Sequence, residues 1–169
     1  MTKKWIPNLL TIFSFIAGLS AIGLTLHQHW DFAGMLIIAA ALFDSIDGRI
    51  ARRLNVSSEF GKQFDTLSDL VSFGVAPAAL SYSLIFSKAG WAGCALVLTF
   101  PMCSAIRLAR YRVIGCASYY IGLPVAVTGS ILTAAAILGR ALPITLHTFL
   151  LVGLAGLMLS TIKIPRFWL

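Results

Sequence analysis

Residues 64–87, FDTLSDLVSFGVAPAALSYSLIFS, join two aspartates to a long apolar run. No charged residue stands between Asp69 and Lys88. A helix needs about 20 apolar residues to cross the hydrocarbon core of a membrane. This stretch therefore predicts a transmembrane helix over 65–87, with its acidic end at one membrane face.

The whole chain has the composition of a membrane protein. Of its 169 residues, 59% are hydrophobic and 11% are charged, whereas a soluble domain carries about 25% charged residues. The first 26 residues resemble a secretory signal but lack a small-residue cleavage site, so we expect a retained span. The apolar windows lie at 7–27, 32–50, 65–87, 90–111, 120–140 and 143–162. We therefore expect an all-α integral membrane protein with six transmembrane helices, forming a single transmembrane domain over residues 1–169.

The basic residues predict the orientation of these helices. Lys88 and Arg140 fall on one side of the expected membrane. Eleven fall on the other side: Lys3, Lys4, Arg49, Arg52, Arg53, Lys62, Arg107, Arg110, Arg112, Lys163 and Arg166. Cytoplasmic connections are rich in Lys and Arg, so we expect both termini to face the cytoplasm, with the protein in the cell membrane. The net charge of +7 then reflects membrane orientation, and we expect no nucleic-acid partner.

Five of the six acidic residues cluster at the cytoplasmic ends of the second and third expected helices. They are Asp44, Asp47, Glu59, Asp65 and Asp69. An Asp deep in a bilayer costs about 2.5–3.5 kcal/mol, and a solvated helix end accounts well only for Glu59. At about 100° per residue, Asp44 and Asp47 project from one helix face. Asp65 and Asp69, four residues apart, do the same on the next helix.

Four carboxylates arranged in this way indicate a site for divalent cations. Carboxylates repel one another unless cations neutralise them, and hard oxygen ligands favour Mg²⁺, Mn²⁺ or Ca²⁺. Four aspartates can hold two cations about 3.5–4 Å apart, the arrangement that assists phosphoryl displacement. A divalent-cation transporter is the alternative from another class of protein, although transporters place their acids near the membrane midplane.

The residues around the aspartates suit a phosphate ligand. Arg52 lies on the helix that carries Asp47, and a guanidinium binds phosphate oxygens through two hydrogen bonds. Gly48 and Gly61 remove side chains where a ligand or a facing helix approaches closely. Ser72 projects about 20° from Asp65 on the same helix.

These residues form the pattern Asp44-x2-Asp47-Gly48-x2-Ala51-Arg52-x8-Gly61-x3-Asp65-x3-Asp69. The pattern resembles the signature of the CDP-alcohol phosphotransferase family at all of its fixed positions. Residues 64–78, Arg107-Leu-Ala-Arg110 and Gly122-Leu-Pro124 resemble the phosphatidylserine synthase branch of that family. Val125 and Ala126 depart from the branch, which often has another proline there.

The resemblance implies an activity and a role for each motif residue. It implies transfer of a phosphatidyl group from CDP-diacylglycerol to the hydroxyl of L-serine, with release of CMP. Asp44, Asp47, Asp65 and Asp69 would ligate two divalent cations, Mg or Mn, and Asp69 would also take the proton from serine. The CDP part would lie beside Gly48, Arg52 and Gly61, with Asn8 and Thr11 reaching the nucleotide. Asn8 has an alternative role in satisfying the start of its helix. A homodimer is expected by analogy with the family.

The acceptor site is less specified by the sequence. Serine carries a carboxylate, and Arg107, Arg110 and Arg112 lie at the cytoplasmic end of the fourth expected helix. Their alternative role is contact with lipid headgroups in accordance with the positive-inside rule. Ser72 is a further acceptor candidate, and helix packing is its alternative role. The same family signature also serves glycerol 3-phosphate and inositol phosphate as acceptors.

Overall fold

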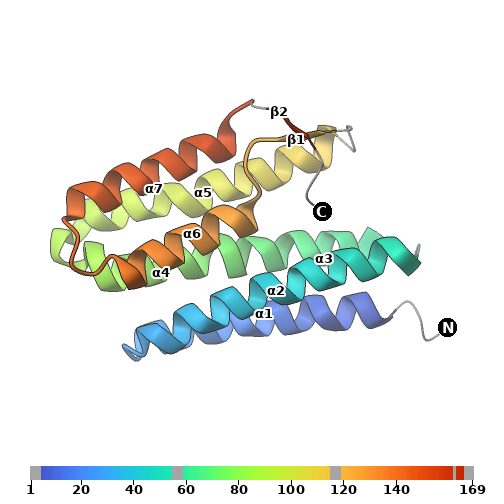
Figure 1. The fold of residues 1–169 in the computed structure, drawn as a ribbon, viewed down its shortest axis with the longest axis horizontal. Coiled ribbons are helices and arrows are strands. Elements are labelled where there is room, and N and C mark those ends of the chain that lie inside the picture. The colour runs from blue at the N-terminus through green and yellow to red at the C-terminus, as the bar shows by residue number, and fades with distance from the viewer. Residues whose placement is uncertain (1–4, 55–58, 115–118, 162, 166–169) are drawn as a thin grey trace.

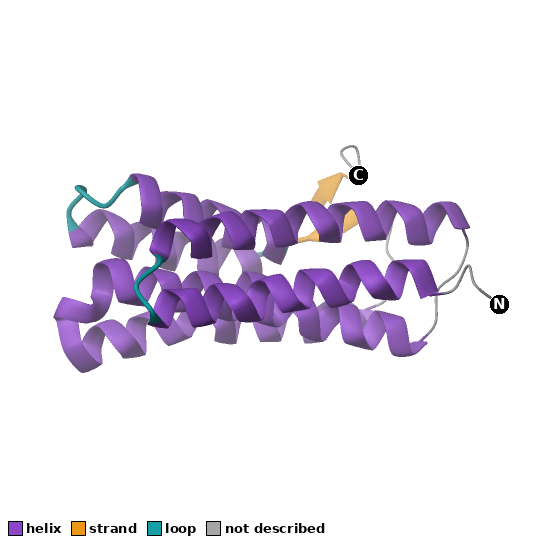
Figure 2. Cartoon of the chain, turned by 90° about the horizontal axis from the view of Figure 1, so that it is seen from below, coloured by secondary structure: helices purple, strands orange, loops and turns teal. Residues whose placement is uncertain are grey.

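The computed structural model describes residues 5–54, 59–114, 119–161 and 163–165, with side chains described for 9–46, 59–113 and 122–161. Its helices run side by side along the long axis of the molecule (Figures 1 and 2). The helical elements are α1 Trp5–Leu26, α2 Trp30–Leu54, α3 Glu59–Asp69, η2 Leu70–Val75, α4 Ala76–Ser81, η3 Tyr82–Phe86, η4 Ser87–Ala89, α5 Gly90–Ile114, α6 Val125–Leu138 and α7 Ile144–Leu159. Two short strands, β1 Tyr119–Ile121 and β2 Lys163–Pro165, accompany them.

The first two helices form an antiparallel pair with small residues at the contact. Ala17 and Ala21 of α1 and Ala40 of α2 are buried, and small side chains let helix backbones approach closely. The hydroxyl of Ser14 donates to the carbonyl of Ala40 across this contact at 3.2 Å. Helix α1 of this pair provides the surface on which α3 is packed.

The segment that follows the acidic pair is a π-helix. In η2, directly after Asp69, the N–H of Ala76 donates to the carbonyl of Val71, five residues earlier. Pro77 explains the wide turn, because a proline has no N–H to donate and its ring clashes with the carbonyl four residues before it. Glycines of two other helices allow close packing on η2. A Cβ at Gly18 would lie 2.3 Å from Ser72 Oγ, and one at Gly129 would lie 2.4 Å from the Phe73 carbonyl oxygen.

The expected helical windows each contain a helix, but the window at 120–140 begins too early. Residues 119–121 form β1, which pairs with β2 in antiparallel register, Tyr119 opposite Pro165 and Ile121 opposite Lys163. Gly122 then adopts φ 71°, and Pro124 precedes the first turn of α6. A positive φ is natural for glycine, so the chain turns here instead of continuing a helix.

The last two helices are also shorter than the predicted spans. Helix α6 has 14 residues and α7 has 16, which at 1.5 Å per residue gives about 21 and 24 Å. The hydrocarbon core is about 30 Å thick. Helices α6 and α7 are therefore shorter than the apolar windows expected at 120–140 and 143–162.

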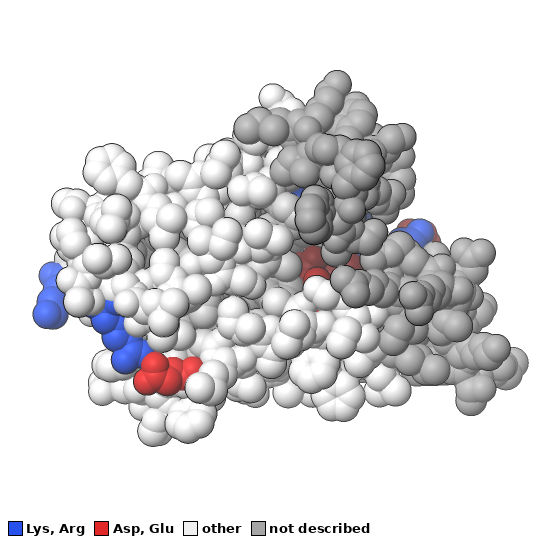
Figure 3. Space-filling model, in the orientation of Figure 1, with Lys and Arg blue, Asp and Glu red and all other residues white. Residues whose placement is uncertain are grey.

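The outside of the helical bundle is apolar. Among the described residues, Leu9–Leu26 and Glu59–Val113 are helical stretches long and apolar enough to cross a membrane. In the most apolar 18-residue window of each stretch, 33% and 28% of the residues are buried in the protein. On the face in Figure 3, charged side chains are absent from most of the described surface between the two ends. This arrangement fits a helical membrane protein.

Candidate active site

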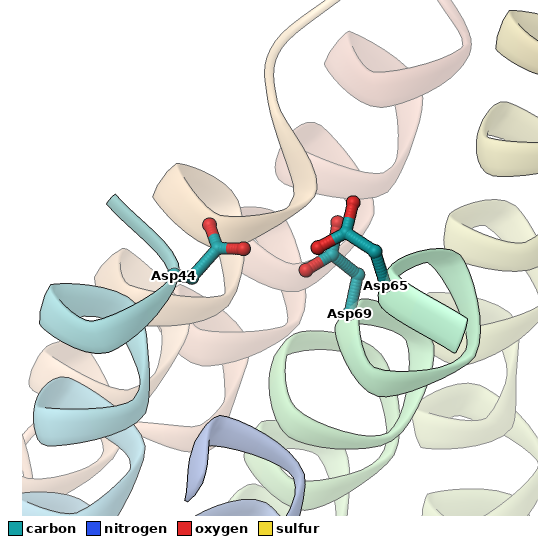
Figure 4. Close-up of side chains that lie close together, drawn as sticks. All are labelled: Asp44, Asp65 and Asp69. Carbon is teal, nitrogen blue, oxygen red and sulfur yellow. The ribbon is translucent and has the colours of Figure 1, made fainter. Parts of the chain in front are cut away.

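Three aspartates converge between α2 and α3. Asp44 projects from α2 toward Asp65 and Asp69, which lie one turn apart on α3 (Figure 4). Each contributes a carboxylate oxygen to a group whose members all lie within 4.8 Å of one another. All three side chains are half-buried. The sequence spacing predicted that carboxylates of two helices lie together, and Asp44, Asp65 and Asp69 do so.

Hydrogen bonds between the helices fix this arrangement. The buried hydroxyl of Ser68 donates to the Thr11 carbonyl at 3.4 Å, and that of Ser72 donates to the Ser14 carbonyl at 3.0 Å. Because Ser14 itself donates to Ala40 of α2, the contacts connect η2, α1 and α2 in sequence. The helix that carries Asp69 is therefore held relative to the helix that carries Asp44.

The donor set fits a divalent cation. Oxygen ligands of Mg²⁺ lie about 2.1 Å from the ion, so two of them are separated by at most about 4.2 Å. The 4.8 Å limit on the carboxylate oxygens is close enough for side-chain rotation to bring them onto one ion. Three carboxylates also favour Mg²⁺, Mn²⁺ or Ca²⁺ over ions that prefer sulfur or imidazole.

The expected nucleotide-binding residues are only partly described. Asn8, Asp47, Gly48 and Arg52 lie outside the residues whose side chains are described. Thr11 is buried, and its carbonyl accepts the hydrogen bond from Ser68. Gly61 is half-buried, one turn before Asp65 on α3. Thr11 and Gly61 thus belong to the two helices that meet beside the aspartates.

The structure gives the expected acceptor residues different surroundings. Ser72 is fully buried, and its hydroxyl is engaged with α1. Arg110 donates from Nη1 to the Leu159 carbonyl at 3.5 Å, in the last turn of α7, where basic side chains satisfy terminal carbonyls. Arg107 is 8% exposed. Arg112 donates from Nε to the hydroxyl of Thr66 at 2.7 Å.

The Arg112 contact brings in a residue that sequence reasoning missed. Thr66 follows Asp65 directly, but its partner is 46 residues away in the chain. A threonine on a helix carries no local signal for such a contact. Because Thr66 adjoins Asp65 on α3, this hydrogen bond places Arg112 beside the acidic cluster.

A surface ion pair lies at the start of α3. Lys62 Nζ is 2.8 Å from Glu59 Oε1, and the hydrogen bond and charge of Lys62 lower the pKa of the Glu59 carboxyl. Both side chains are well exposed, and exposed pairs contribute little stability. Glu59 is therefore a solvated helix-end charge, as the sequence suggested.

Comparison with known proteins identifies the family. Residues 4–164 match the CDP-alcohol phosphatidyltransferase family. The chain belongs to this family. The resemblance inferred from the aspartate motif is thereby confirmed.

Three relatives with the same name illustrate the similarity. A CDP-diacylglycerol-serine O-phosphatidyltransferase of Bacillus subtilis is 34% identical over 97% of this chain and 92% of its own length. The one of Methanocaldococcus jannaschii is 35% identical over 96% of this chain and 74% of its length. The one of Mycobacterium leprae is 41% identical over 63% of this chain and 35% of its length.

Family membership decides between the two classes of protein that the acidic cluster left open. The CDP-alcohol phosphatidyltransferases are enzymes, so the cluster belongs to an enzyme, and the divalent-cation transporter is the wrong alternative. The converging aspartates are the group in this chain that suits a metal-dependent phosphatidyl transfer.

Proposed function

We propose that this protein transfers the phosphatidyl group of CDP-diacylglycerol to the hydroxyl of L-serine, giving phosphatidylserine and CMP. The observation that carries the proposal is the match to the CDP-diacylglycerol-serine O-phosphatidyltransferase of Bacillus subtilis, which extends over 97% of this chain and 92% of the relative. The aspartate cluster between α2 and α3 supports it, because it supplies the ligand type that phosphatidyl transfer needs.

The proposed reaction is a direct in-line displacement. The serine oxygen forms a bond to the phosphorus of the phosphatidyl group, and the bond from that phosphorus to the CMP oxygen breaks. The proton of the serine hydroxyl passes to a base, for which Asp69 is the proposed residue. The half-burial of Asp69 beside Asp44 and Asp65 supports this role, because the carboxylate is not enclosed by the protein.

Asp44, Asp65 and Asp69 are the described residues that would hold divalent cations, and Asp47 is the fourth ligand proposed from the motif. When bound, two such ions, Mg or Mn, supply neutralising charge to the phosphoryl oxygens and acidify the attacking alcohol. The carboxylates also orient the reacting groups, because their helices are connected by the hydrogen bonds from Ser72 to Ser14 and from Ser14 to Ala40.

The remaining motif residues are proposed to bind the substrates. Gly48, Arg52 and Gly61 would bind the CDP part of the donor, with Asn8 and Thr11 reaching it from α1. For the serine carboxylate, Arg112 has the support of its position beside Asp65. Arg110 is held at the end of α7, so we assign it a smaller part in substrate binding.

We also propose a membrane arrangement: one domain over residues 1–169, six transmembrane helices and both termini in the cytoplasm. Lys62 and Arg112 lie at the end that carries the acidic cluster. Arg140 pairs with Asp31 at the start of α2, at the opposite end. The active site would then face the cytoplasm at the cell membrane. By analogy with its family, the protein would work as a homodimer.

The experiment that tests this function is CMP release by the purified, detergent-solubilised protein from CDP-diacylglycerol and Mn²⁺. Parallel reactions contain L-serine, glycerol 3-phosphate, inositol phosphate or no acceptor. We expect release that depends on L-serine. Release with another acceptor would retain the metal site and overturn the assignment of serine. Absence of release with every acceptor, in protein shown to be folded, would overturn the catalytic proposal.

A further inference from the structure

The hydroxyl of Thr66 makes contacts in two directions. It donates to the Lys62 carbonyl, one turn earlier on α3, at 3.0 Å. It also accepts from Arg112 of α5, through Nε at 2.7 Å and through Nη2. A hydroxyl has one hydrogen and two lone pairs. Because the hydroxyl hydrogen is donated to the Lys62 carbonyl, the oxygen lone pairs accept the hydrogen bonds from the guanidinium.

This contact determines where the Arg112 charge lies. The arginine side chain has many rotamers, and holding it in one of them before a ligand arrives reduces the entropy lost on binding. A guanidinium carries five N–H donors, and Thr66 engages only two of its nitrogens. Thr66 stands on α3 directly after Asp65 and three residues before Asp69. The fixed cation is thus adjacent to the acidic cluster.

We infer that Thr66 is a positioning residue, whose hydroxyl holds Arg112 beside the aspartates so that the guanidinium binds an anionic oxygen group of a substrate. The inference deepens the proposed function and rests on it. The anionic group is either the carboxylate of the acceptor amino acid or the phosphate of the lipid donor. Both bind a guanidinium through the same charge-assisted hydrogen bonds.

The test compares Thr66→Val, which keeps the shape but removes the acceptor, with Thr66→Ser, which keeps the hydroxyl. We expect Thr66→Val to raise the KM of one substrate about tenfold, the effect of losing a charge-assisted hydrogen bond, with kcat little changed. Thr66→Ser should restore the KM. A raised KM for L-serine at saturating CDP-diacylglycerol identifies the carboxylate, and a raised KM for CDP-diacylglycerol identifies the phosphate.

A double-mutant cycle with Arg112→Ala separates positioning from a purely structural role. If Thr66 acts through Arg112, Thr66→Val adds no further increase in KM to the Arg112→Ala protein. Equal increases in both backgrounds would overturn the inference. So would a Thr66→Val protein that loses thermal stability and keeps both KM values. If Thr66→Val does not fold, Thr66→Ala takes its place in the cycle.

A matched control is Thr148→Val in α7. The Thr148 hydroxyl also donates to the carbonyl four residues earlier, at 2.9 Å, and it lies near the start of its helix, away from the aspartates. We expect its KM values to equal those of the unaltered protein. CMP release by the unaltered protein distinguishes failure of the proposed function from failure of the inference about Thr66. If the unaltered protein uses an acceptor other than L-serine, the KM values for CDP-diacylglycerol and for that acceptor still test Thr66.

Discussion

At the scale of single residues, Asp69 carries the proposed proton transfer. Asp69→Asn keeps the size of the side chain but removes its basicity and lowers its affinity for a cation. We expect CMP release to fall by at least about 10²–10⁴-fold, the usual contribution of a general base, while CDP-diacylglycerol binding persists. The measurement is CMP release together with direct binding of CDP-diacylglycerol to the purified protein.

Asp31→Asn is the matched control for this prediction. Asp31 lies at the start of α2 and pairs with Arg140, at the other end of the helix from Asp44. We expect its CMP release to be unchanged. If Asp69→Asn instead abolished CDP-diacylglycerol binding, Asp69 would be chiefly a ligand and the base would have to be sought elsewhere.

The candidate site could be predicted from sequence only where its residues are close along the chain. The spacing of Asp65 and Asp69 places both on one turn of helix, and the structure has them there. The contact between Thr66 and Arg112 spans 46 residues, so no local pattern contains it. For Ser72 the sequence left two roles open, acceptor binding and helix packing. Only the tertiary structure shows that its hydroxyl donates to the Ser14 carbonyl of α1.

At the scale of helices, the close approach of α1 to η2 depends on Gly18. A Cβ there would meet Ser72 Oγ at 2.3 Å and the backbone Cα of Ser72 at 2.7 Å. Backbone cannot rotate away, so Gly18→Ala must separate the two helices. We expect a loss of about 1–3 kcal/mol in the free energy of unfolding, measured as a lower midpoint of unfolding in detergent.

Gly23→Ala provides the comparison within the same helix. A Cβ at Gly23 meets nothing within 4 Å, and alanine is favoured over glycine in a helix by up to about 1 kcal/mol. We expect this variant to be as stable as the unaltered protein or slightly more stable. Equal destabilisation by both substitutions would mean that the contact at Ser72 does not set the position of α1.

The helices themselves were predictable because apolar runs long enough to cross a membrane have few alternatives to helix. The ends of these helices and their irregular turns could not be predicted from the sequence. The π-helical turn of η2 depends on how Pro77 is accommodated by the wide turn ending at Ala76, and proline permits several such adjustments. The strand β1 depends on a pairing partner at Lys163–Pro165, far away in the sequence.

At the scale of the whole molecule, the two ends are chemically different. The end that carries the aspartate cluster has Lys62 and Arg112. At the other end, Arg140 pairs with Asp31 and lies 5.9 Å from the ring centroid of Trp30. The Trp30 indole N–H donates to Ser83 of η3 at 3.0 Å. These contacts connect the start of α2, the turn after α6 and η3, so polar contacts hold the end opposite the aspartate cluster together.

This asymmetry predicts which end faces the cytoplasm. We would replace Cys94, Cys103 and Cys116 and then introduce one cysteine, either Lys62→Cys at the acidic end or Lys88→Cys at the other. Both positions are exposed. Because the acidic end carries the excess of basic residues, a membrane-impermeant thiol reagent should label position 88 in intact cells and position 62 only after permeabilisation. Labelling of position 62 but not position 88 in intact cells would mean that the orientation is inverted and that the proposed active site is at the outer face.

Labelling of both positions in intact cells would mean that the helical segment from Glu59 to Ala89 does not cross the membrane. Retained CMP release by the cysteine-free protein is the control that its fold is intact.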